Sequence, residues 1–551
     1  MNLKTKLLSS LDTVYNDYVR DSNSFENVEM LQNEAASVQL AAMYEKQEKK
    51  EREKITALVS ISSPIADKIT IYTAENVPLE RVCVDAADDW FIRKTPGLYP
   101  DRLHLYEDGL RLPNGLWKAL WININEELSD ISGGEYPVAI KLTDSENGDK
   151  LYETEFTVKV MGVKLPKQKI YVTNWIHYDC IAYLANTEPM TETFFETAEK
   201  YIRLAVKNGQ NMILTPAFTP PLDTPVGEER NTVQLVAVEK CGDKYHFDLS
   251  LLDRFIKMCL NCGAEYFEHS HLFTQWGAEH APKIVVKENG EDKKMFGWHT
   301  DATSAEYREF LHAYLTELKK YLTDCGFGKR FFFHVSDEPY DKKLENYKSA
   351  ADFIHSELEG YKSGDALREY DFYENGLVKT PIVANSEIDA FYQKANPLWM
   401  YYTGGECYDN LANRVIGMPH ERSRILGVQL YYHNIEGFLH WGYNAHHSLL
   451  SRKILDPRLS ADMGCDYTGG SSFLVYPDRN GAEPSPRLIT FRDLMQDTRA
   501  FFLLEELTSR EHVCEIIKKH IPDISFKCFV TAKQLIELRA EVNGKIEQYA
   551  V

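Results

Sequence analysis

Two neighbouring carboxylic acids, Asp337 and Glu338, stand where a strongly apolar stretch of the chain ends. The stretch Phe331 to Val335 is predicted to be a buried strand, because it begins with the apolar run Phe331 to Phe333. Pro339 has no backbone N–H and restricts Glu338 to extended geometry, so the strand is expected to stop here. Carboxyl groups held at the rim of a sheet can act as acid and base in catalysis. The alternative is an ordinary helix start, where Asp-Glu-Pro is also common.

The elements expected to position this pair lie in residues 166–508, where short strands alternate with helical patterns. This α/β alternation predicts a (β/α)8 barrel of the TIM type, although the connection from Asn385 to Leu398 is too short for a full helix. The predicted strands are Ile170 to Trp175, Asn211 to Thr215, Glu265 to His271, Phe331 to Val335, Pro381 to Asn385, Leu398 to Tyr402, Gly437 to Trp441 and Ser472 to Tyr476. The predicted helices are Thr191 to Lys207, Leu251 to Leu260, Ala305 to Cys325, Tyr347 to Glu357, Pro419 to Asn434 and Pro486 to Leu507.

Residues 1–165 have a different character, with β-branched, aromatic and alternating segments separated by turn signals such as Pro113-Asn114-Gly115. This spacing predicts an N-terminal all-β domain, a β-sandwich. Residues 509–551 are expected to form a mostly helical C-terminal extension with one possible strand, Ser525 to Val530.

The net charge of −21 over 551 residues argues against nucleic acid as a partner, because its phosphates would be repelled, and against docking on anionic membranes. The first residues show no signal-peptide pattern, and no apolar run of about 18 residues indicates membrane insertion. The ten cysteines are scattered, with only Cys259 and Cys262 close together, a weak pattern for zinc. Together these features predict a cytoplasmic location.

Polar and aromatic residues gather at the ends of the predicted strands, and in a barrel these ends carry the active site. Aromatic faces pack on the C–H surface of a sugar, while amides, carboxylates and imidazoles bond its hydroxyls, so the pattern predicts a sugar site. A metal alternative rests on His269 and His271, which would share one strand face, but no clear third or fourth ligand accompanies them. Neither a Gly-rich phosphate loop nor a Gly-x-Ser-x-Gly elbow is present.

These motifs resemble those of glycoside hydrolase family 123. The resemblance covers most of the chain and implies a β-N-acetylgalactosaminidase acting on glycosphingolipid-type glycans or related oligosaccharides. The segments that carry it are His334 to Pro339, Trp175 to Asp179, Phe218 to Thr224, Ser270 to Gly277 and Trp399 to Thr403, with Asn33 to Ala35, Tyr99 to Asp101 and Trp121 in the first domain.

Because the two acids are adjacent in the sequence, fewer catalytic mechanisms are open to them. A retaining enzyme with a protein nucleophile needs its carboxyl groups about 5 Å apart on opposite sides of the scissile bond, which neighbouring residues cannot easily span. A 2-acetamido sugar supplies its own nucleophile: the amide oxygen attacks C1, an oxazolinium-type intermediate forms, and water opens it with retention. By resemblance, Glu338 is the general acid/base, and Asp337 orients the acetamido N–H and stabilises the developing positive charge.

The resemblance also implies sugar contacts, no cofactor and no metal. Tyr401 is the first candidate to hold the acetamido oxygen and Tyr443 the second. The other candidate sugar contacts are Trp441, Trp399, Trp276, Trp298, His271 and Asn385. The expected partner is a small glycan. The oligomeric state and the choice of galacto or gluco configuration at C4 do not follow from the sequence.

Three other functions stay open at this point. A carboxylate such as Glu268 or Glu387 would serve as nucleophile in a glycosidase that needs no 2-acetamido group. A non-catalytic barrel would bind carbohydrate only. A metal-dependent hydrolase would use His269 and His271.

Overall fold

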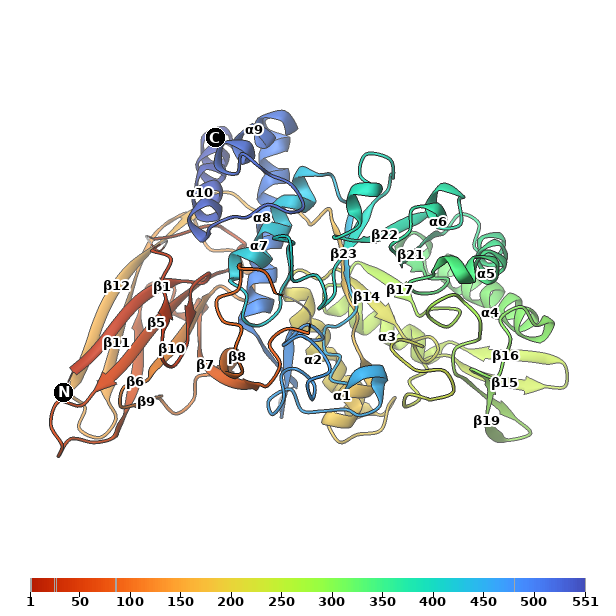
Figure 1. Ribbon diagram of the computed structural model, residues 1–551, viewed down its shortest axis with the longest axis horizontal. Coiled ribbons are helices and arrows are strands. Elements are labelled where there is room, and N and C mark those ends of the chain that lie inside the picture. Colours follow the sequence, from red (N-terminus) through yellow and green to blue (C-terminus); the bar gives the residue numbers. More distant parts are fainter. Residues whose placement is uncertain (1, 24, 26, 85–86, 480, 551) are drawn as a thin grey trace.

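The computed structural model describes residues 2–23, 25, 27–84, 87–479 and 481–550. Figure 1 shows a β-rich N-terminal region at one end of the molecule and a barrel at the other, with the last three helices gathered near their junction. These helices are α8 (Pro486–Leu507), α9 (Arg510–His520) and α10 (Ala532–Tyr549). None of the described helices combines the length and the apolar composition needed to cross a membrane.

Eight strands form a nearly closed barrel in the order β13-β24-β23-β22-β21-β20-β17-β14. All neighbouring pairs in this order are parallel, as the predicted barrel requires. At the seam between the first and last strands, the Asn211 side-chain oxygen accepts the Val172 N–H at 2.8 Å, and the Asn211 N–H donates to the Val172 carbonyl at 3.2 Å. The strands are β13 (Tyr171–Asn174), β14 (Met212–Thr215), β17 (Tyr266–His269), β20 (Phe331–Phe333), β21 (Lys362–Leu367), β22 (Thr380–Ala384), β23 (Trp399–Tyr401) and β24 (Gly437–His440).

Helices connect the barrel strands, five of them where the sequence predicts a helix and two short ones, Tyr178–Leu184 and Asp371–Glu374, where it does not. They are α1 (Tyr178–Leu184), α2 (Glu192–Lys207), α3 (Ser250–Asn261), α4 (Ala305–Asp324), α5 (Leu344–Glu357), α6 (Asp371–Glu374) and α7 (His420–Tyr432). Between β22 and β23 the structure has a 3-10 turn, Ile388–Ala390, in place of a helix. This agrees with the expectation that the connection is too short. Two hairpins inserted among these elements, β15 (Ala237–Cys241) with β16 (Lys244–Asp248) and β18 (Ile284–Glu288) with β19 (Glu291–Phe296), join in one four-stranded sheet.

The sequence analysis missed the barrel strand β21. Its residues, Lys-Ser-Gly-Asp-Ala-Leu, include no β-branched or aromatic side chain, so local propensity does not indicate a strand. Packing against the neighbouring strands makes this segment a strand instead. A Cβ on Gly364 would lie 2.2 Å from the Thr380 carbonyl oxygen and 2.9 Å from the Phe332 ring, so only glycine allows this close approach.

The predicted eighth strand, Ser472 to Tyr476, is wrong. β13 and β24 pair directly with each other, which leaves no place for this segment in the barrel. Its second half instead starts β25 (Val475–Asp478), which pairs with β26 (Gly481–Pro484) in an antiparallel hairpin. The apolar run is still buried, because Phe473 and Tyr476 pack in a separate cluster that includes Leu79 of the N-terminal region.

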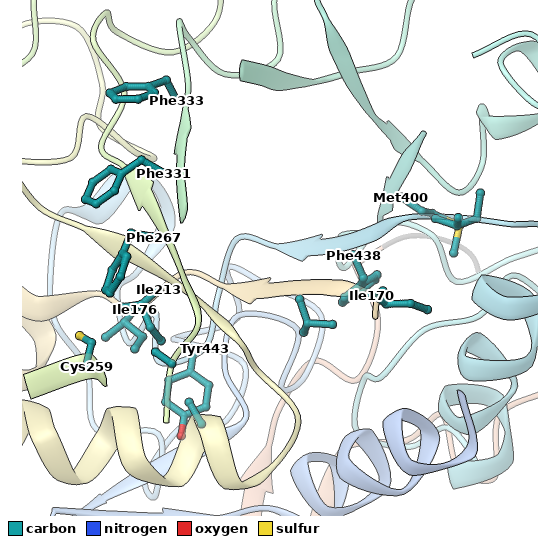
Figure 2. Close-up of a cluster of buried hydrophobic side chains, with 14 of the residues drawn as sticks. Ile170, Ile176, Ile213, Cys259, Phe267, Phe331, Phe333, Met400, Phe438 and Tyr443 are labelled. Carbon is teal, nitrogen blue, oxygen red and sulfur yellow. The ribbon is translucent and has the colours of Figure 1, made fainter. Parts of the chain in front are cut away.

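Two apolar layers arise because successive side chains of a strand point to opposite faces. Phe331 and Phe333 lie in the large layer that the barrel shares with its helices, and Figure 2 shows them there together with Phe267. Phe332, between them in sequence, belongs to the cluster inside the barrel, where it stacks on Trp399 with ring centroids 4.9 Å apart. The interior is therefore a packed core, as is usual for such barrels.

The N-terminal region is β-rich, as expected, and holds two five-stranded sheets. Residues from both sheets share one apolar core, for example Leu40 and Ile122 from one sheet with Ile140 and Val158 from the other. The first sheet contains β1 (Asn2–Ser9), β5 (Ala36–Glu45), β10 (Trp117–Ile124), β7 (Ile69–Leu79) and β8 (Gly97–Leu105). The second contains β4 (Val28–Leu31), β12 (Lys150–Met161), β11 (Gly134–Asp144), β6 (Lys54–Ser62) and β9 (Leu110–Pro113). A small hairpin is formed by β2 (Thr13–Val14) and β3 (Val19–Arg20).

The C-terminal extension is helical, as expected, but the predicted strand from Ser525 to Val530 is wrong. The alternation that suggested it is real, because Phe526, Cys528 and Val530 are buried while the residues between them are exposed. No strand of the described chain pairs with this segment. The Gln429 side-chain amide donates instead to the Ser525 carbonyl at 2.9 Å and the Phe526 carbonyl at 3.2 Å.

Candidate active site

A cavity of about 340 Å³ opens at the carboxyl ends of the barrel strands. Its acidic lining residues are Asp223, Asp337, Glu338 and Asp466, and its aromatic lining residues are Trp175, Trp276, Tyr401, Trp441 and Tyr467. Trp175, Tyr401 and Trp441 end a barrel strand or follow one directly, and the other residues lie in the segments beyond the strand ends, which is where barrel active sites lie. The N-terminal region also contributes to the lining through Val84.

Hydrogen bonds from two neighbouring strand ends hold the turn that carries the two acids. The Glu338 N–H donates to the Ala366 carbonyl at 3.1 Å, and the Trp276 N–H donates to the Asp337 carbonyl at 2.7 Å. Glu338 has a φ of +40°, which is uncommon for a residue with a side chain. The extended geometry predicted before Pro339 is therefore wrong, because tertiary contacts outweigh the local preference. Strain of this kind is typical of functional positions.

Asp365, in the unpredicted strand β21, fixes the segment that leads into this turn. Its carboxylate accepts the N–H groups of Val335 at 3.0 Å and Ser336 at 3.3 Å, and the Tyr347 hydroxyl at 2.5 Å. These backbone donors lie just beyond the end of β20, so the carboxylate takes the place of a strand partner.

A buried histidine, His334, lies directly before the turn. Its Nε2 is 2.7 Å from a Glu268 carboxylate oxygen, and its Nδ1 is 3.4 Å from an Asp365 carboxylate oxygen. Burial alone would lower the pKa of this imidazole, but the two carboxylates raise the pKa of His334 to about 10. The side chain is therefore positively charged at neutral pH, and its charge acts to lower the pKa of Asp337.

The two acids have different surroundings. Desolvation raises the pKa of Asp337 well above its usual range, and the neighbouring Glu338 charge adds to the rise. The Glu338 side chain is 34% exposed, accepts the Tyr401 hydroxyl, and lies 3.7 Å from the Arg368 guanidinium. The arrangement thus favours a proton on Asp337 and places two donors at Glu338. Neighbouring carboxyl groups in unlike environments can divide acid and base roles.

The structure brings five of the predicted site residues together at the cavity: Asp337, Glu338, Tyr401, Trp441 and Trp276. Burial and the Glu338 charge raise the pKa of Tyr401 well above its usual value, so its hydroxyl stays a neutral donor. The Trp276 side chain is 37% exposed, and its φ of +63° places it in the left-handed region. Aromatic side chains from different strands thus surround the acid pair.

Three predicted sugar contacts lie in the core and do not line the cavity. Trp399 is buried inside the barrel, where its ring stacks between Phe332 and Tyr171. Tyr443 is buried in the outer layer, with its hydroxyl donating to the Tyr201 carbonyl at 3.2 Å. Asn385 is buried, and its side-chain amide donates to the Ala412 carbonyl at 2.9 Å.

Two further predicted contacts, His271 and Trp298, also lie outside the cavity lining. His271 is buried, stacked on His334 with ring centroids 4.6 Å apart and edge-on to Trp175 at 5.0 Å. His271 therefore packs against Trp175, a residue of the cavity lining, from the core side. The Trp298 indole N–H donates to the Glu228 carbonyl at 3.0 Å, in the inserted hairpin region.

The expectation that His269 and His271 share a strand face is wrong, because β17 ends at His269. The His269 Nε2 lies 2.7 Å from the Tyr314 hydroxyl of α4, whereas His271 faces Trp175. The two imidazoles therefore do not converge on one point, as a metal site would require.

The two glutamates considered as alternative nucleophiles are also placed outside the lining. Glu268 is fully buried in the barrel, where it accepts the Trp175 indole N–H at 3.0 Å in addition to its pairing with His334. Glu387 is exposed in the short connection after β22. Neither lines the cavity.

Another group, His177, Asp179 and His447, brings potential metal ligands within 4.8 Å of one another among the described residues. The Arg230 guanidinium already fills this group, with its Nη2 2.9 Å from the His177 Nδ1 and 2.6 Å from the Asp179 Oδ1. A permanent guanidinium charge would repel a cation here. The group is best explained as a buried ion pair.

Several residues of the cavity lining, and Arg368 beside Glu338, were not singled out from the sequence. Arg368 follows the unpredicted strand β21, so it escaped notice together with that strand. Asp466 and Tyr467 lie in a long irregular segment after β24 that carries no periodic pattern. Asp223 stands within a segment that carried the family resemblance, Phe218 to Thr224, and its position after a predicted strand was the available signal.

An α/β barrel whose cavity combines paired carboxyl groups with aromatic side chains has the arrangement of a glycoside hydrolase. The sequence model of the glycoside hydrolase 123 catalytic domain matches residues 175–504, more than half of the chain. This protein belongs to glycoside hydrolase family 123. The match confirms the resemblance seen in the sequence motifs, and its range contains both acids.

A solved structure of a family member has the same fold. A family 123 glycoside hydrolase from Clostridium perfringens, studied for glycolipid glycan hydrolysis, has a TM-score of 0.71 at 14% identity, with 100% of this chain and 97% of that chain covered. A family 39 glycoside hydrolase from Bacteroides cellulosilyticus WH2 gives a TM-score of 0.32 at 11% identity, with 80% of each chain covered. No curated protein matches the sequence.

Proposed function

We propose that this protein is a retaining exo-β-N-acetylgalactosaminidase that removes terminal β-linked N-acetylgalactosamine by substrate-assisted catalysis. The observation that carries the proposal is that Asp337 and Glu338 are consecutive residues of one turn and both line the cavity. Consecutive residues are poorly placed to flank a scissile bond as nucleophile and acid, which takes a separation of about 5 Å. A 2-acetamido sugar supplies its own nucleophile and removes this requirement.

In this mechanism Glu338 protonates the glycosidic oxygen and later takes a proton from the water that opens the oxazolinium-type intermediate. Asp337 accepts the acetamido N–H and stabilises the positive charge that develops on the ring. A donated N–H favours the ionised carboxylate, so substrate binding shifts the pKa of Asp337 downward. The buried charge of His334 supports this shift because it stabilises ionised Asp337.

The sugar contacts in the proposal are those among the predicted residues that line the cavity. Tyr401 holds the acetamido oxygen with the hydroxyl that now donates to Glu338. It is favoured over Tyr443, whose hydroxyl is engaged in the outer layer. Trp441 and Trp276 offer aromatic faces to sugar rings.

The preference for N-acetylgalactosamine rests on the family resemblance and on the Clostridium perfringens relative, which was studied for glycolipid glycan hydrolysis. Oligosaccharides or glycosphingolipid-type glycans are therefore the proposed substrates. We further propose that residues 1–165 form a β-sandwich domain, 166–508 the catalytic barrel and 509–551 an extension. The shared core of the two N-terminal sheets supports the first of these assignments. The cytoplasmic location stays a prediction from cysteine usage.

A panel of p-nitrophenyl β-glycosides tests the proposed function. We expect hydrolysis of the N-acetylgalactosaminide with kcat/KM at least about 1000-fold above that of the galactoside, because the galactoside lacks the acetamido nucleophile that orientation makes effective. A thiazoline analogue of the intermediate is expected to inhibit competitively.

Two results would contradict this function. Comparable rates on the galactoside and the N-acetylgalactosaminide would favour a protein carboxylate nucleophile. Binding of N-acetylgalactosamine without turnover of any glycoside would favour a carbohydrate-binding protein.

Replacement of His334 by glutamine is expected to move the acidic limb of the kcat/KM pH profile upward by about one unit. The reason is that the His334 charge lowers the pKa of Asp337, which must be ionised to accept the acetamido N–H. Removing the charge raises that pKa, so a higher pH is needed to reach the active form. The measurement is kcat/KM against pH for the wild type and the variant.

His269→Gln is the matched control. His269 is also buried, and because it has no carboxylate partner among the described residues, burial lowers its pKa to about 4, which leaves it uncharged at neutral pH. We expect this control to keep the wild-type pH profile. An unshifted profile in a folded His334→Gln variant would contradict the role of the buried charge.

A further inference from the structure

A third carboxylate, Asp223, lines the cavity on a different strand end from the acid pair. It follows β14, whereas Asp337 follows β20, and β17 lies between these two strands in the sheet. The proposed mechanism gives Asp223 no task. Its contacts, and the free energy that its strained and buried position costs, nevertheless indicate a function.

Hydrogen bonds fix the position of Asp223 relative to the acid pair. The Tyr467 hydroxyl donates to its Oδ2 at 2.7 Å, and its own N–H donates to the Gln275 side-chain oxygen at 2.5 Å. Gln275 directly precedes Trp276, whose N–H bonds the Asp337 carbonyl at 2.7 Å. A single short segment thus connects Asp223 to the turn that carries Asp337.

The backbone conformation and the burial of Asp223 both cost folding free energy. Its φ of +43° lies in the left-handed region, which residues with a side chain rarely adopt. Burial raises the pKa of Asp223, although the Tyr467 hydroxyl and the Arg230 charge oppose the rise. A strained and partly desolvated carboxylate at a cavity wall is poorly explained by folding alone.

The neighbours of Asp223 suit a sugar ring. The Tyr467 ring lies 5.4 Å from the Trp441 ring between centroids, so the carboxylate stands close to an aromatic face. A sugar that packs on such a face presents its hydroxyl groups at the edge of the ring. An ionised carboxylate accepts hydrogen bonds from hydroxyl groups and forms stronger bonds than a neutral acceptor.

We propose that Asp223 binds a sugar hydroxyl remote from the reacting centre and thereby contributes to the choice of sugar configuration, with Tyr467 holding the carboxylate in place. The inference rests on the proposed function, because it concerns the same bound sugar. C1 carries the scissile bond and C2 the acetamido group, so the hydroxyls on C3, C4 and C6 are the candidates.

The test compares the wild type with Asp223→Asn on p-nitrophenyl β-N-acetylgalactosaminide and on its 3-, 4- and 6-deoxy analogues. We expect the substitution to lower kcat/KM on the parent substrate by about 10- to 100-fold, the usual contribution of a hydrogen bond to a charged group. On the one analogue that lacks the bound hydroxyl, the wild type is itself reduced and Asp223→Asn causes no further loss. That analogue identifies the hydroxyl.

Two more variants accompany the test. Tyr467→Phe keeps the ring beside Trp441 but removes the hydroxyl that holds Asp223, and we expect a smaller loss that vanishes on the same analogue. It keeps the inference testable if Asp223→Asn does not fold. Asp466→Asn is the control, because this cavity carboxylate accepts the Leu449 N–H at 2.8 Å. Any loss it causes should be the same on all four substrates.

The outcomes separate the two proposals. An equal loss for Asp223→Asn on the parent and on all three deoxy analogues would overturn the inference and leave the proposed function standing. A wild type inactive on every 2-acetamido β-glycoside would overturn the proposed function, and the inference with it.

Discussion

Replacement of Glu338 by glutamine is expected to lower kcat on an oligosaccharide substrate by about 1000-fold, within the range usual for general acid–base groups. Glutamine keeps the size of the side chain, but it has no acidic proton to give to the leaving oxygen. The Tyr401 hydroxyl and Arg368 surround Glu338 in the structure and stay in place in the variant. The defect should therefore concern proton transfer.

Comparing substrates with different leaving groups tests the acid role of Glu338 more sharply. A 2,4-dinitrophenyl glycoside departs without protonation, so we expect kcat/KM on this substrate to fall less than about tenfold in Glu338→Gln. Its kcat should still fall strongly, because the water that opens the intermediate needs a base. Equal losses of kcat/KM on good and poor leaving groups would contradict the acid role.

Glu387→Gln is the matched control for this experiment. Glu387 is an exposed glutamate that follows another barrel strand and lies outside the cavity lining. We expect its replacement to leave kcat and kcat/KM within about twofold of the wild type, as for most surface substitutions. Loss of activity here would instead revive the mechanism with a protein nucleophile.

Replacement of Asp337 by asparagine is expected to lower kcat by about 100- to 1000-fold, the usual effect of removing one preorganised electrostatic contact. Asparagine cannot supply the negative charge that stabilises the oxazolinium-type transition state. The affinity for the thiazoline inhibitor should fall by a similar factor, while KM for the substrate changes less. These quantities are measured by steady-state kinetics and inhibition.

The same substitution should not destabilise the protein. Desolvation and Glu338 raise the pKa of Asp337, so the unfolded chain ionises this carboxyl at a lower pH than the folded protein does. The wild type therefore loses stability as the pH rises above the usual aspartate range. Asparagine removes that loss, and we expect an unchanged or higher Tm at neutral pH. A Tm that falls together with the activity would indicate a structural role for Asp337.

Much of the barrel could be predicted because its strong patterns are local. Runs such as Phe331 to Phe333 and the periodic helices around them keep the same structure in almost any globular context. The acid pair was found for the same reason, since a buried strand that ends in Asp-Glu-Pro is visible in a short window. The family match then confirmed the class of enzyme.

The strands and contacts that the sequence analysis missed or placed wrongly have a different physical cause. They depend on residues that are far away in the sequence. β21 has weak strand propensity and exists because Gly364 fits between Phe332 and Thr380. The apolar run from Phe473 is as strand-like as the others, yet the direct pairing of β13 with β24 excludes it from the barrel. Trp399 is the first residue of β23 and Tyr443 follows β24, and both side chains lie in the core rather than in the cavity lining.

The sequence by itself determined that two adjacent acids follow the buried Phe331–Phe333 strand of an α/β barrel, because an apolar run and the alternation of strands and helices are local patterns. Only the tertiary structure decided what surrounds them. The Tyr401 hydroxyl and the strained Asp223 come from segments far apart in the chain, and the fold alone brings them to one cavity, while the buried carboxylates that keep His334 charged come from two further strands. The protonation states and the proposed sugar contacts depend on that proximity, which no local pattern encodes.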